Sequence, residues 1–235
     1  MQWVWDVTSR VGLHPVTWLG AVYSDTVFRA RGPGVQGTVA LTIDDGICRH
    51  NIDRSLLEEV RAMLRERGAT ATFMLCSDYL SGHEGAMRQM IEEGHEFGNH
   101  CPKDWGGYAS LASEEFEEQL LETQTAIEGI VGAEVKWFRA PQGKYTASMR
   151  KSCQKLGLRH ALGDCYCDDY AITDSEWVAA TLLRQVQSGS IIILHMPERG
   201  YREHVFRALA LLLEGLERRN FRAVTLSSLM DLSDD

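Results

Sequence analysis

The sequence predicts an α/β fold built on parallel strands, and three observations lead to this prediction. From residue 37 onward, short runs rich in β-branched and aromatic residues alternate with longer segments of helical periodicity. Glycines stand where most of those helical segments should end, and Asp, His or Arg repeatedly follows a predicted strand directly. Strict alternation indicates parallel pairing, because parallel strands need a crossover connection that is usually a helix.

The predicted elements follow one another without a visible internal repeat. The predicted strands cover residues 38–43, 69–75, 95–98, 135–138, 160–163, 190–194 and 221–225. The predicted helices cover residues 52–67, 84–93, 113–130, 145–156, 175–187 and 201–218. Ser113 before two glutamates is a favourable helix start, and Gly68, Gly94, Gly132 and Gly157 are suited to helix ends.

The first 36 residues differ from the rest in lacking this alternation. They end in Arg31-Gly32-Pro33-Gly34, which interrupts regular structure. We therefore expect residues 1–36 to be an extension packed on a main domain of residues 37–235. We expect Trp3, Trp5 and Trp18 to pack into the core, with stacking against carbohydrate as the alternative.

Composition limits the classes of partner. Hydrophobic residues make up 44% of the 235 residues and charged residues 24%, as in ordinary globular proteins. The net charge of -9 argues against nucleic acid or an anionic membrane surface as partner, because both favour clustered Lys and Arg.

The N-terminal sequence, the apolar runs and the cysteine spacing bear on where the protein is found. No run approaches the roughly 18 apolar residues that span a bilayer. The N-terminus has no signal-peptide pattern, so the sequence predicts a cytoplasmic location, or a secreted one if the chain has been shortened. The six cysteines are irregularly spaced and predict free thiols.

Six reactive side chains lie at the carboxyl ends of predicted strands. They are Asp44, Asp45, His100, Arg139, Asp164 and His195. Any one of them could be an ordinary turn residue. In a parallel barrel, however, these ends meet on one face, where side chains from distant parts of the sequence converge. The adjacent carboxylates and the histidine predict a hydrolytic metal site.

Five segments in the same order resemble the motifs of the polysaccharide deacetylase family. They are Thr42-Ile43-Asp44-Asp45-Gly46, His100-Cys101-Pro102-Lys103-Asp104, Arg139-Ala140-Pro141-Gln142-Gly143, the stretch 163–170 and Ser190-Ile191-Ile192-Ile193-Leu194-His195. The resemblance runs from about residue 37 to residue 229. It implies a distorted parallel (β/α) barrel of about seven strands.

The resemblance also implies a metal site. Asp44 would be the general base, while Asp45, His100 and Asp104 would hold one divalent ion. Residues four apart share one side of a helical turn, so His100 and Asp104 fit a chelating pair, and Pro102 is acceptable in the first turn of a short helix.

The resemblance further implies which residue orients the base and which residue protonates the leaving group. Arg139 would orient Asp44, and His195 would be the general acid, supported by Asp164 or Asp169. The residues implied to contact the substrate or the oxyanion are Gln142, through its backbone N–H, together with Tyr170 and Leu194.

Three residues depart from the family pattern. Asp104 stands where a second histidine is usual, which gives an Asp-His-Asp set suited to zinc, with cobalt, manganese, iron and nickel as alternatives. Tyr170 and Gln142 replace aromatic residues common at their positions, so the acetylated substrate need not be an insoluble polymer.

The sequence thus predicts a metal-dependent hydrolase that removes N-acetyl groups from amino sugars of chitin-like or peptidoglycan-like oligosaccharides. The alternatives are an amidase acting on a small cyclic amide and a catalytically silent homologue that binds sugar or a protein. Cys165 and Cys167 are too close in sequence for a normal zinc knuckle without a partner pair. Five cysteines, Cys48, Cys76, Cys101, Cys165 and Cys167, nevertheless fall near the predicted active face, and we hypothesise that one pair of them can oxidise or capture a metal there.

Overall fold

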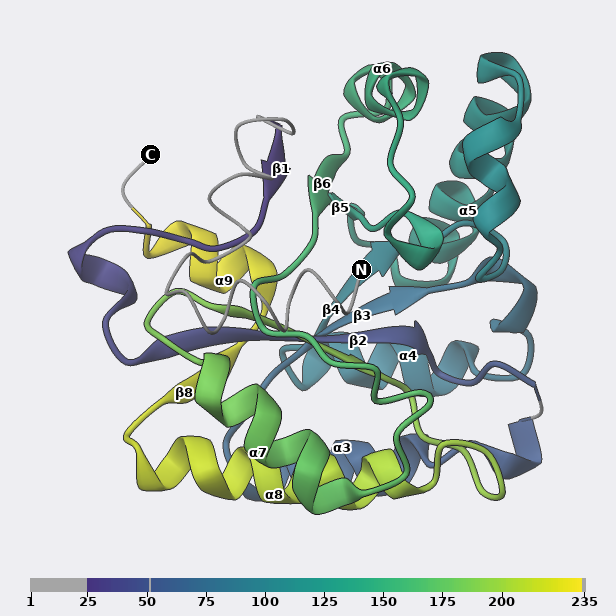
Figure 1. The fold of residues 1–235 in the computed structure, drawn as a ribbon. Helices are drawn as coiled ribbons and strands as arrows, with labels where there is room; N and C mark the ends of the chain where they lie inside the picture. Colours follow the sequence, from purple (N-terminus) through teal and green to yellow (C-terminus); the bar gives the residue numbers. More distant parts are fainter. Residues whose placement is uncertain (1–24, 51, 234–235) are drawn as a thin grey trace.

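Strand β2 (Thr38–Gly46) is the central element of the sheet (Figure 1). It is buried along its whole length and pairs in parallel with β3 (Thr72–Leu75), β7 (Ile191–His195) and β8 (Arg222–Val224). A strand that is buried on both faces has a nearly continuous run of apolar residues, and this explains why the segment from Val39 to Ile43 is largely apolar. The computed structural model describes residues 25–50 and 52–233.

The other strands extend the sheet from β3 in the order β4, β5, β6 and β1, each pair parallel. Their bounds are β4 (Glu96–Asn99), β5 (Trp137–Phe138), β6 (Arg159–Ala161) and β1 (Thr26–Val27). Beyond β6, the Cys165 amide donates to Ile191 O at 3.2 Å, and the Ile193 amide donates to Cys165 O at 2.9 Å. These two bonds join the chain after β6 to β7, and the predicted distorted parallel barrel is confirmed.

Helices cover the outside of the barrel in the alternation that the sequence predicts. They are α3 (Leu57–Glu66), α4 (Glu84–Glu92), α5 (Ser113–Val131), α6 (Ala147–Lys155), α7 (Ser175–Gln185), α8 (His204–Arg218) and α9 (Leu226–Asp231). Helices α7 and α8 pack side by side below β2 in Figure 1, whereas α5 and α6 lie at the opposite end of the sheet. The predicted helix 52–67 is shorter than expected, because a separate 3-10 turn, η2 (Ile52–Arg54), precedes α3.

The segment predicted as an extension contributes to the sheet. Thr26 and Val27 form β1, paired in parallel with His160 and Ala161 of β6. The Thr26 hydroxyl also lies 2.8 Å from the His160 ring nitrogen Nδ1. Residues 1–24, including the three tryptophans that we expect to pack on the core, lie outside the described residues.

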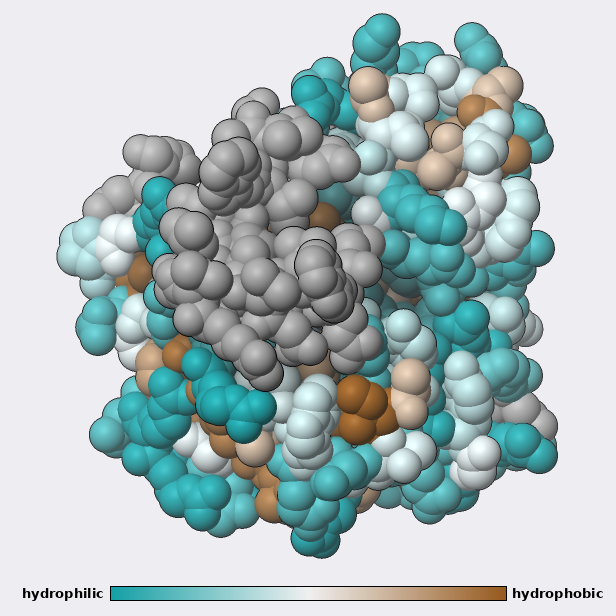
Figure 2. Space-filling view, in the orientation of Figure 1, coloured by the Kyte–Doolittle hydropathy of each residue, from teal (hydrophilic) through white to brown (hydrophobic). Residues whose placement is uncertain are grey.

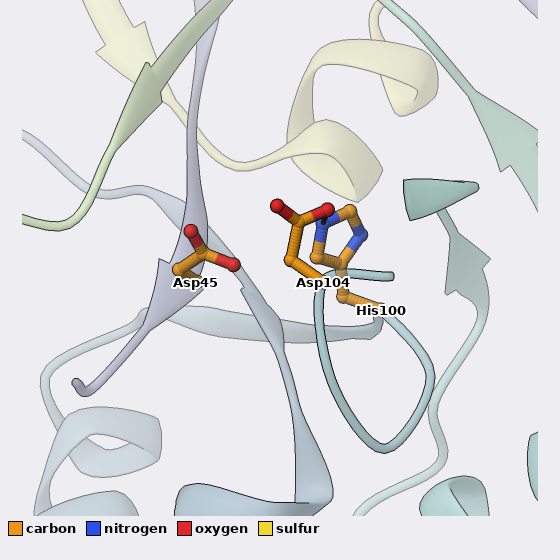
Figure 3. Close-up of side chains that lie close together, drawn as sticks. All are labelled: Asp45, His100 and Asp104. Atoms are coloured by element: carbon orange, nitrogen blue, oxygen red, sulfur yellow. Dashed lines mark ion pairs between the residues drawn. The ribbon is translucent and has the colours of Figure 1, made fainter. Parts of the chain in front are cut away.

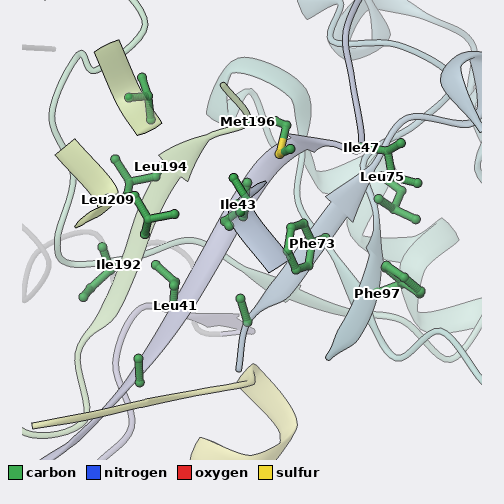
Figure 4. Packing of buried hydrophobic residues seen from close by; sticks show 14 of the residues in the cluster. Leu41, Ile43, Ile47, Phe73, Leu75, Phe97, Ile192, Leu194, Met196 and Leu209 are labelled. Atoms are coloured by element: carbon green, nitrogen blue, oxygen red, sulfur yellow. The ribbon is translucent and has the colours of Figure 1, made fainter. Parts of the chain in front are cut away.

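The main hydrophobic core lies between the barrel and its helices. Side chains of β2, β3 and β7 interlock there with those of the surrounding helices (Figure 4). On the face shown in Figure 2, hydrophilic residues predominate over the described part of the surface. Among the described residues, no helix has both the length and the apolar character needed to cross a membrane.

Glycine is required where the barrel closes. A Cβ built on buried Gly163 would lie 2.5 Å from the backbone oxygen of Ile191 and 2.9 Å from Ile193 Cγ1. A backbone oxygen of a paired strand cannot move aside without breaking the junction between this segment and β7. We therefore expect Gly163→Ala to lower the free energy of unfolding by about 1–3 kcal/mol, measured by urea denaturation.

The matched control is Gly129→Ala in helix α5, where an added Cβ has no atom within 4 Å. Alanine is favoured over glycine in a helix by roughly 1 kcal/mol, so this change should stabilise the protein. Equal unfolding free energies for wild type and Gly163→Ala would contradict the steric reading.

Candidate active site

Five of the six predicted strand-end residues gather at the carboxyl end of the barrel. Asp44 and Asp45 lie near the end of β2, and His195 ends β7. His100 directly follows β4, and Arg139 directly follows β5. Parallel strands bring these positions together because all their carboxyl ends lie at one edge.

Asp45, His100 and Asp104 form the candidate metal site (Figure 3). Each offers one ligand atom, and these atoms lie within 4.8 Å of one another. Among the described residues this is the group whose donors suit a divalent ion. The His100 ring nitrogen Nδ1 lies 2.8 Å from Arg139 O, which fixes Nδ1 as the donor and leaves Nε2 free to bind a cation.

The segment from His100 to Asp104 is a loop, and the predicted helical turn is wrong. Cys101 has φ of 62°, outside the right-handed helical region, and its amide is held by Asn99 Oδ1 at 2.9 Å. Pro102 therefore lies in a bend rather than in a first helical turn. The loop nevertheless places His100 Nε2 4.0 Å from Asp104 Oδ1.

Two arginines that the sequence reading did not identify contact the candidate ligands. Arg49 Nη1 lies 2.8 Å from Asp45 Oδ2 and 2.8 Å from Asp104 Oδ2. Arg202 Nη1 donates to Asp45 Oδ2 at 2.7 Å. Arg49 lies outside every predicted element, and Arg202, expected in the predicted helix 201–218, lies in the loop before α8, so neither was expected at the site.

Asp45 is held as an anion by its surroundings. Burial raises the pKa of Asp45, but the charges of His195, His100, Arg202 and Arg49 outweigh burial and hold that pKa well below its usual range. A buried anion beside a second carboxylate and a free imidazole nitrogen has the donor chemistry of a divalent cation site. The three residues therefore fit the ion that the family pattern implies.

Asp44 and Arg139 form a buried ion pair beside this group. Arg139 Nη1 donates to Asp44 Oδ1 at 2.6 Å and to the Thr42 hydroxyl at 2.8 Å. Arg139 Nε donates to Ala161 O at 3.0 Å, so the guanidinium is fixed from two sides. An arginine so fixed holds the Asp44 carboxylate in one orientation.

His195 is paired with Asp169. Its Nδ1 lies 2.7 Å from Asp169 Oδ1, and its amide donates to Asp169 Oδ2 at 2.8 Å. Burial lowers the pKa of His195, but the carboxylates of Asp169 and Asp44 outweigh burial and raise this pKa to about 9. The imidazole is therefore positively charged at neutral pH.

Asp164, the other carboxylate that the sequence left open as the partner of His195, binds elsewhere. Its Oδ1 accepts from the Ile191 amide at 2.9 Å, and its Oδ2 accepts from the Ser190 hydroxyl at 3.1 Å. Asp164 thus anchors the start of β7 at the barrel closure.

The three residues implied to contact substrate differ in exposure. Gln142 is exposed with φ of 56°. Tyr170 is 48% exposed, and its ring lies edge-on to the His195 ring at 5.5 Å between centroids. Leu194 is 1% exposed and packs in the hydrophobic core, so a substrate could touch it only after other side chains move.

The six cysteines are free and buried. Burial raises the pKa of every one of these thiols, which disfavours the thiolate that metal capture or disulfide exchange requires. Cys76 lies beside the site, with Sγ 3.9 Å from Asp45 Oδ1. The geometry thus gives no support to a cysteine pair that binds metal.

Residues 31–161, more than half of the chain, match the sequence profile of the family described as polysaccharide deacetylase. The chain belongs to the polysaccharide deacetylase family. It is 29% identical over 201 residues to peptidoglycan-N-acetylglucosamine deacetylase of Bacillus cereus, across 84% of this chain and 90% of that protein. It is 30% identical over 197 residues to chitooligosaccharide deacetylase of Azorhizobium caulinodans, across 79% of this chain and 91% of that protein.

A solved structure with the same fold is that of a CE4 family pseudoenzyme from Bacillus anthracis. The TM-score is 0.77 at 18% identity, across 89% of this chain and 70% of that one, and at this identity the likeness shows the fold alone. The family profile covers Asp44, Asp45, His100, Asp104 and Arg139. Asp169 and His195 lie beyond the matched residues.

The raised pKa of His195 is open to direct measurement. In an NMR titration of the metal-free protein, we expect His195 to lose its proton near pH 9. Asp169→Asn removes the main opposing charge, so the pKa should fall towards or below the ordinary value of 6.5. His160, whose pKa burial lowers to about 3, is the internal control and should stay neutral in both proteins. An unchanged His195 pKa in the variant would rule out Asp169 as the cause.

Proposed function

We propose that this chain is a metal-dependent hydrolase that removes N-acetyl groups from the amino sugars of peptidoglycan-like or chitin-like oligosaccharides. The observation that carries the proposal is the arrangement of two oriented proton-transfer groups around one candidate metal site. Asp44 is held by Arg139, and His195 is held by Asp169. The deacetylases of Bacillus cereus and Azorhizobium caulinodans support the substrate class.

Each side chain has a distinct task in amide hydrolysis. A divalent ion held by Asp45, His100 and Asp104 would acidify water and polarise the acetyl carbonyl. Asp44, oriented by Arg139, accepts the proton of the attacking water. The Gln142 amide would donate to the developing oxyanion.

The leaving amine needs a proton, and His195 is the group that supplies it. Its raised pKa keeps the imidazole protonated at neutral pH, so the acid is ready before the C–N bond breaks. Asp169 stabilises the charged ring and fixes its orientation. Tyr170, exposed beside this ring, forms part of the surface that a sugar would contact.

Zinc is the ion that we propose, with cobalt, manganese, iron and nickel as alternatives. One imidazole and two carboxylates suit zinc, but the second carboxylate shifts preference towards harder ions relative to a two-histidine set.

Two other functions are distinguished by specific residues. An amidase for a small cyclic amide would use the same acid and base and would differ from the deacetylase at the substrate side, where Tyr170 and Gln142 replace the usual aromatic residues. A silent binding homologue is favoured by one observation, the bridging of Asp45 and Asp104 by Arg49. Metal binding and acetate release separate the three.

Acetate release from N-acetylglucosamine oligomers is the direct test. Metal-stripped protein should release acetate only after a divalent ion is added back. Asp44→Asn should lower kcat by about 10²–10⁴-fold, because it removes the base, while leaving the Kd for the ion within a few-fold. No acetate with any of the five ions would overturn the proposed function, and release without an ion would overturn the role of the metal.

The charge of Asp104 should show in the pH profile. Asp104→His replaces an anionic ligand with a neutral one, so more of the ion's charge acts on the water and the water becomes more acidic. The acid limb of kcat/KM should therefore move to lower pH in this variant. Asp231→His, outside the site, is the control and should leave the profile unchanged. An acid limb that moves to higher pH would contradict this reasoning.

A further inference from the structure

Arg49 lies between the two carboxylates that would hold the ion. Its Nη1 is 2.8 Å from Asp45 Oδ2 and 2.8 Å from Asp104 Oδ2. One nitrogen that bridges two carboxylates neutralises part of the charge that attracts a divalent cation. Zinc–carboxylate distances are only about 2.0–2.2 Å, so an ion bound to these same two oxygens would need the space that Nη1 fills.

The backbone of Arg49 is fixed, whereas its side chain has a route outward. The Arg49 amide donates to the carboxylate of Glu198, which is fully buried. The same loop is held by the Ser55 hydroxyl, which donates to Ile47 O at 2.6 Å. The Arg49 side chain is 24% exposed, so a change of rotamer can move the guanidinium towards solvent without disturbing the loop.

Arg202 provides the contrast. Its side chain is 5% exposed and lies over the ring of Tyr201, with Cζ 4.9 Å from the ring centroid. Among the described residues, the ion pair of Arg202 is with Asp45, at 2.7 Å. Arg202 is therefore a fixed partner of one carboxylate, while Arg49 spans both.

We propose that Arg49 is an internal cation that competes with the divalent ion for Asp45 and Asp104, and so sets the metal affinity of the site. The ion and the bridging guanidinium exclude each other, and the side chain of Arg49 swings out when the ion binds. In the metal-free protein Arg49 keeps the two carboxylates from repelling each other. This inference rests on the proposed function only in taking these residues as the metal site.

The test is the Kd for zinc and for manganese, measured by calorimetry on the metal-stripped full chain. Arg49→Met keeps most of the length and removes the charge, and we expect it to tighten binding of both ions at least tenfold. Arg49→Lys keeps the charge and should bind more like wild type. Arg54→Met, at the exposed arginine that ends η2, is the matched control and should leave Kd unchanged.

Thermal unfolding gives a readout that does not depend on activity. Without metal, Arg49→Met should have a lower Tm than wild type, because Asp45 and Asp104 lose their shared counter-charge. On saturation with zinc, the rise in Tm should be larger for the variant than for wild type.

Every outcome bears on the inference. Binding by Arg49→Met that is equal to or weaker than that of wild type would overturn it and make Arg49 a support of the ligands. Binding by the variant alone, with none by wild type, would uphold it. Binding by neither protein would overturn both this inference and the metal-dependent function. Tighter binding without acetate release would uphold the inference and overturn only the proposed function.

Discussion

The buried guanidinium of Arg139 is the interaction on which the site depends. Its side chain donates to Asp44, to the Thr42 hydroxyl on β2 and to Ala161 O on β6, two strands that are not neighbours in the sheet. Its backbone is used as well, since its amide donates to Asn99 O and its carbonyl oxygen lies against the His100 ring. One residue therefore positions the candidate base and a candidate metal ligand, and it ties both to the barrel wall. An unpaired charge at this depth would be costly, so removing Asp44 alone would leave the Arg139 guanidinium uncompensated and would destabilise the protein.

Electrostatic balance explains how so many ionised groups share a small volume. Asp45 is surrounded by cationic or protonatable groups, and its anionic form is the one that these neighbours stabilise. His195 is the reverse case, a half-buried cation held by carboxylates. The candidate acid and the candidate base have opposite partners, since His195 is paired with the carboxylate of Asp169 and Asp44 with the guanidinium of Arg139.

The sequence predicts the barrel well because its signals are local and repeated. Apolar runs and helix-ending glycines place most strands and helices within a few residues, and the order of polar strand-end residues leads to Asp44, Arg139 and His195.

Three features could not be predicted in this way. The loop of His100 and Asp104 depends on the left-handed conformation of Cys101, and cysteine has no preference for that conformation from which it could be predicted. Strand β1 is two residues long and is defined only by pairing with distant β6. Arg49 and Arg202 reach Asp45 from irregular loops, where spacing carries no information about proximity.

Residues other than glycine with positive φ are concentrated around the candidate site. Asp45, Cys101, Gln142 and Arg202 have values between 53° and 62°, and β-branched Ile47 has 83°. Such conformations cost about 1–3 kcal/mol each and persist only where the surrounding contacts enforce them. A laboratory selection for heat resistance alone would therefore find these loops among the easiest places to gain stability. Variants that relaxed the backbone there would survive heating while losing the alignment of acid, base and metal ligands, so engineering of this barrel should draw its stabilising changes from the helices.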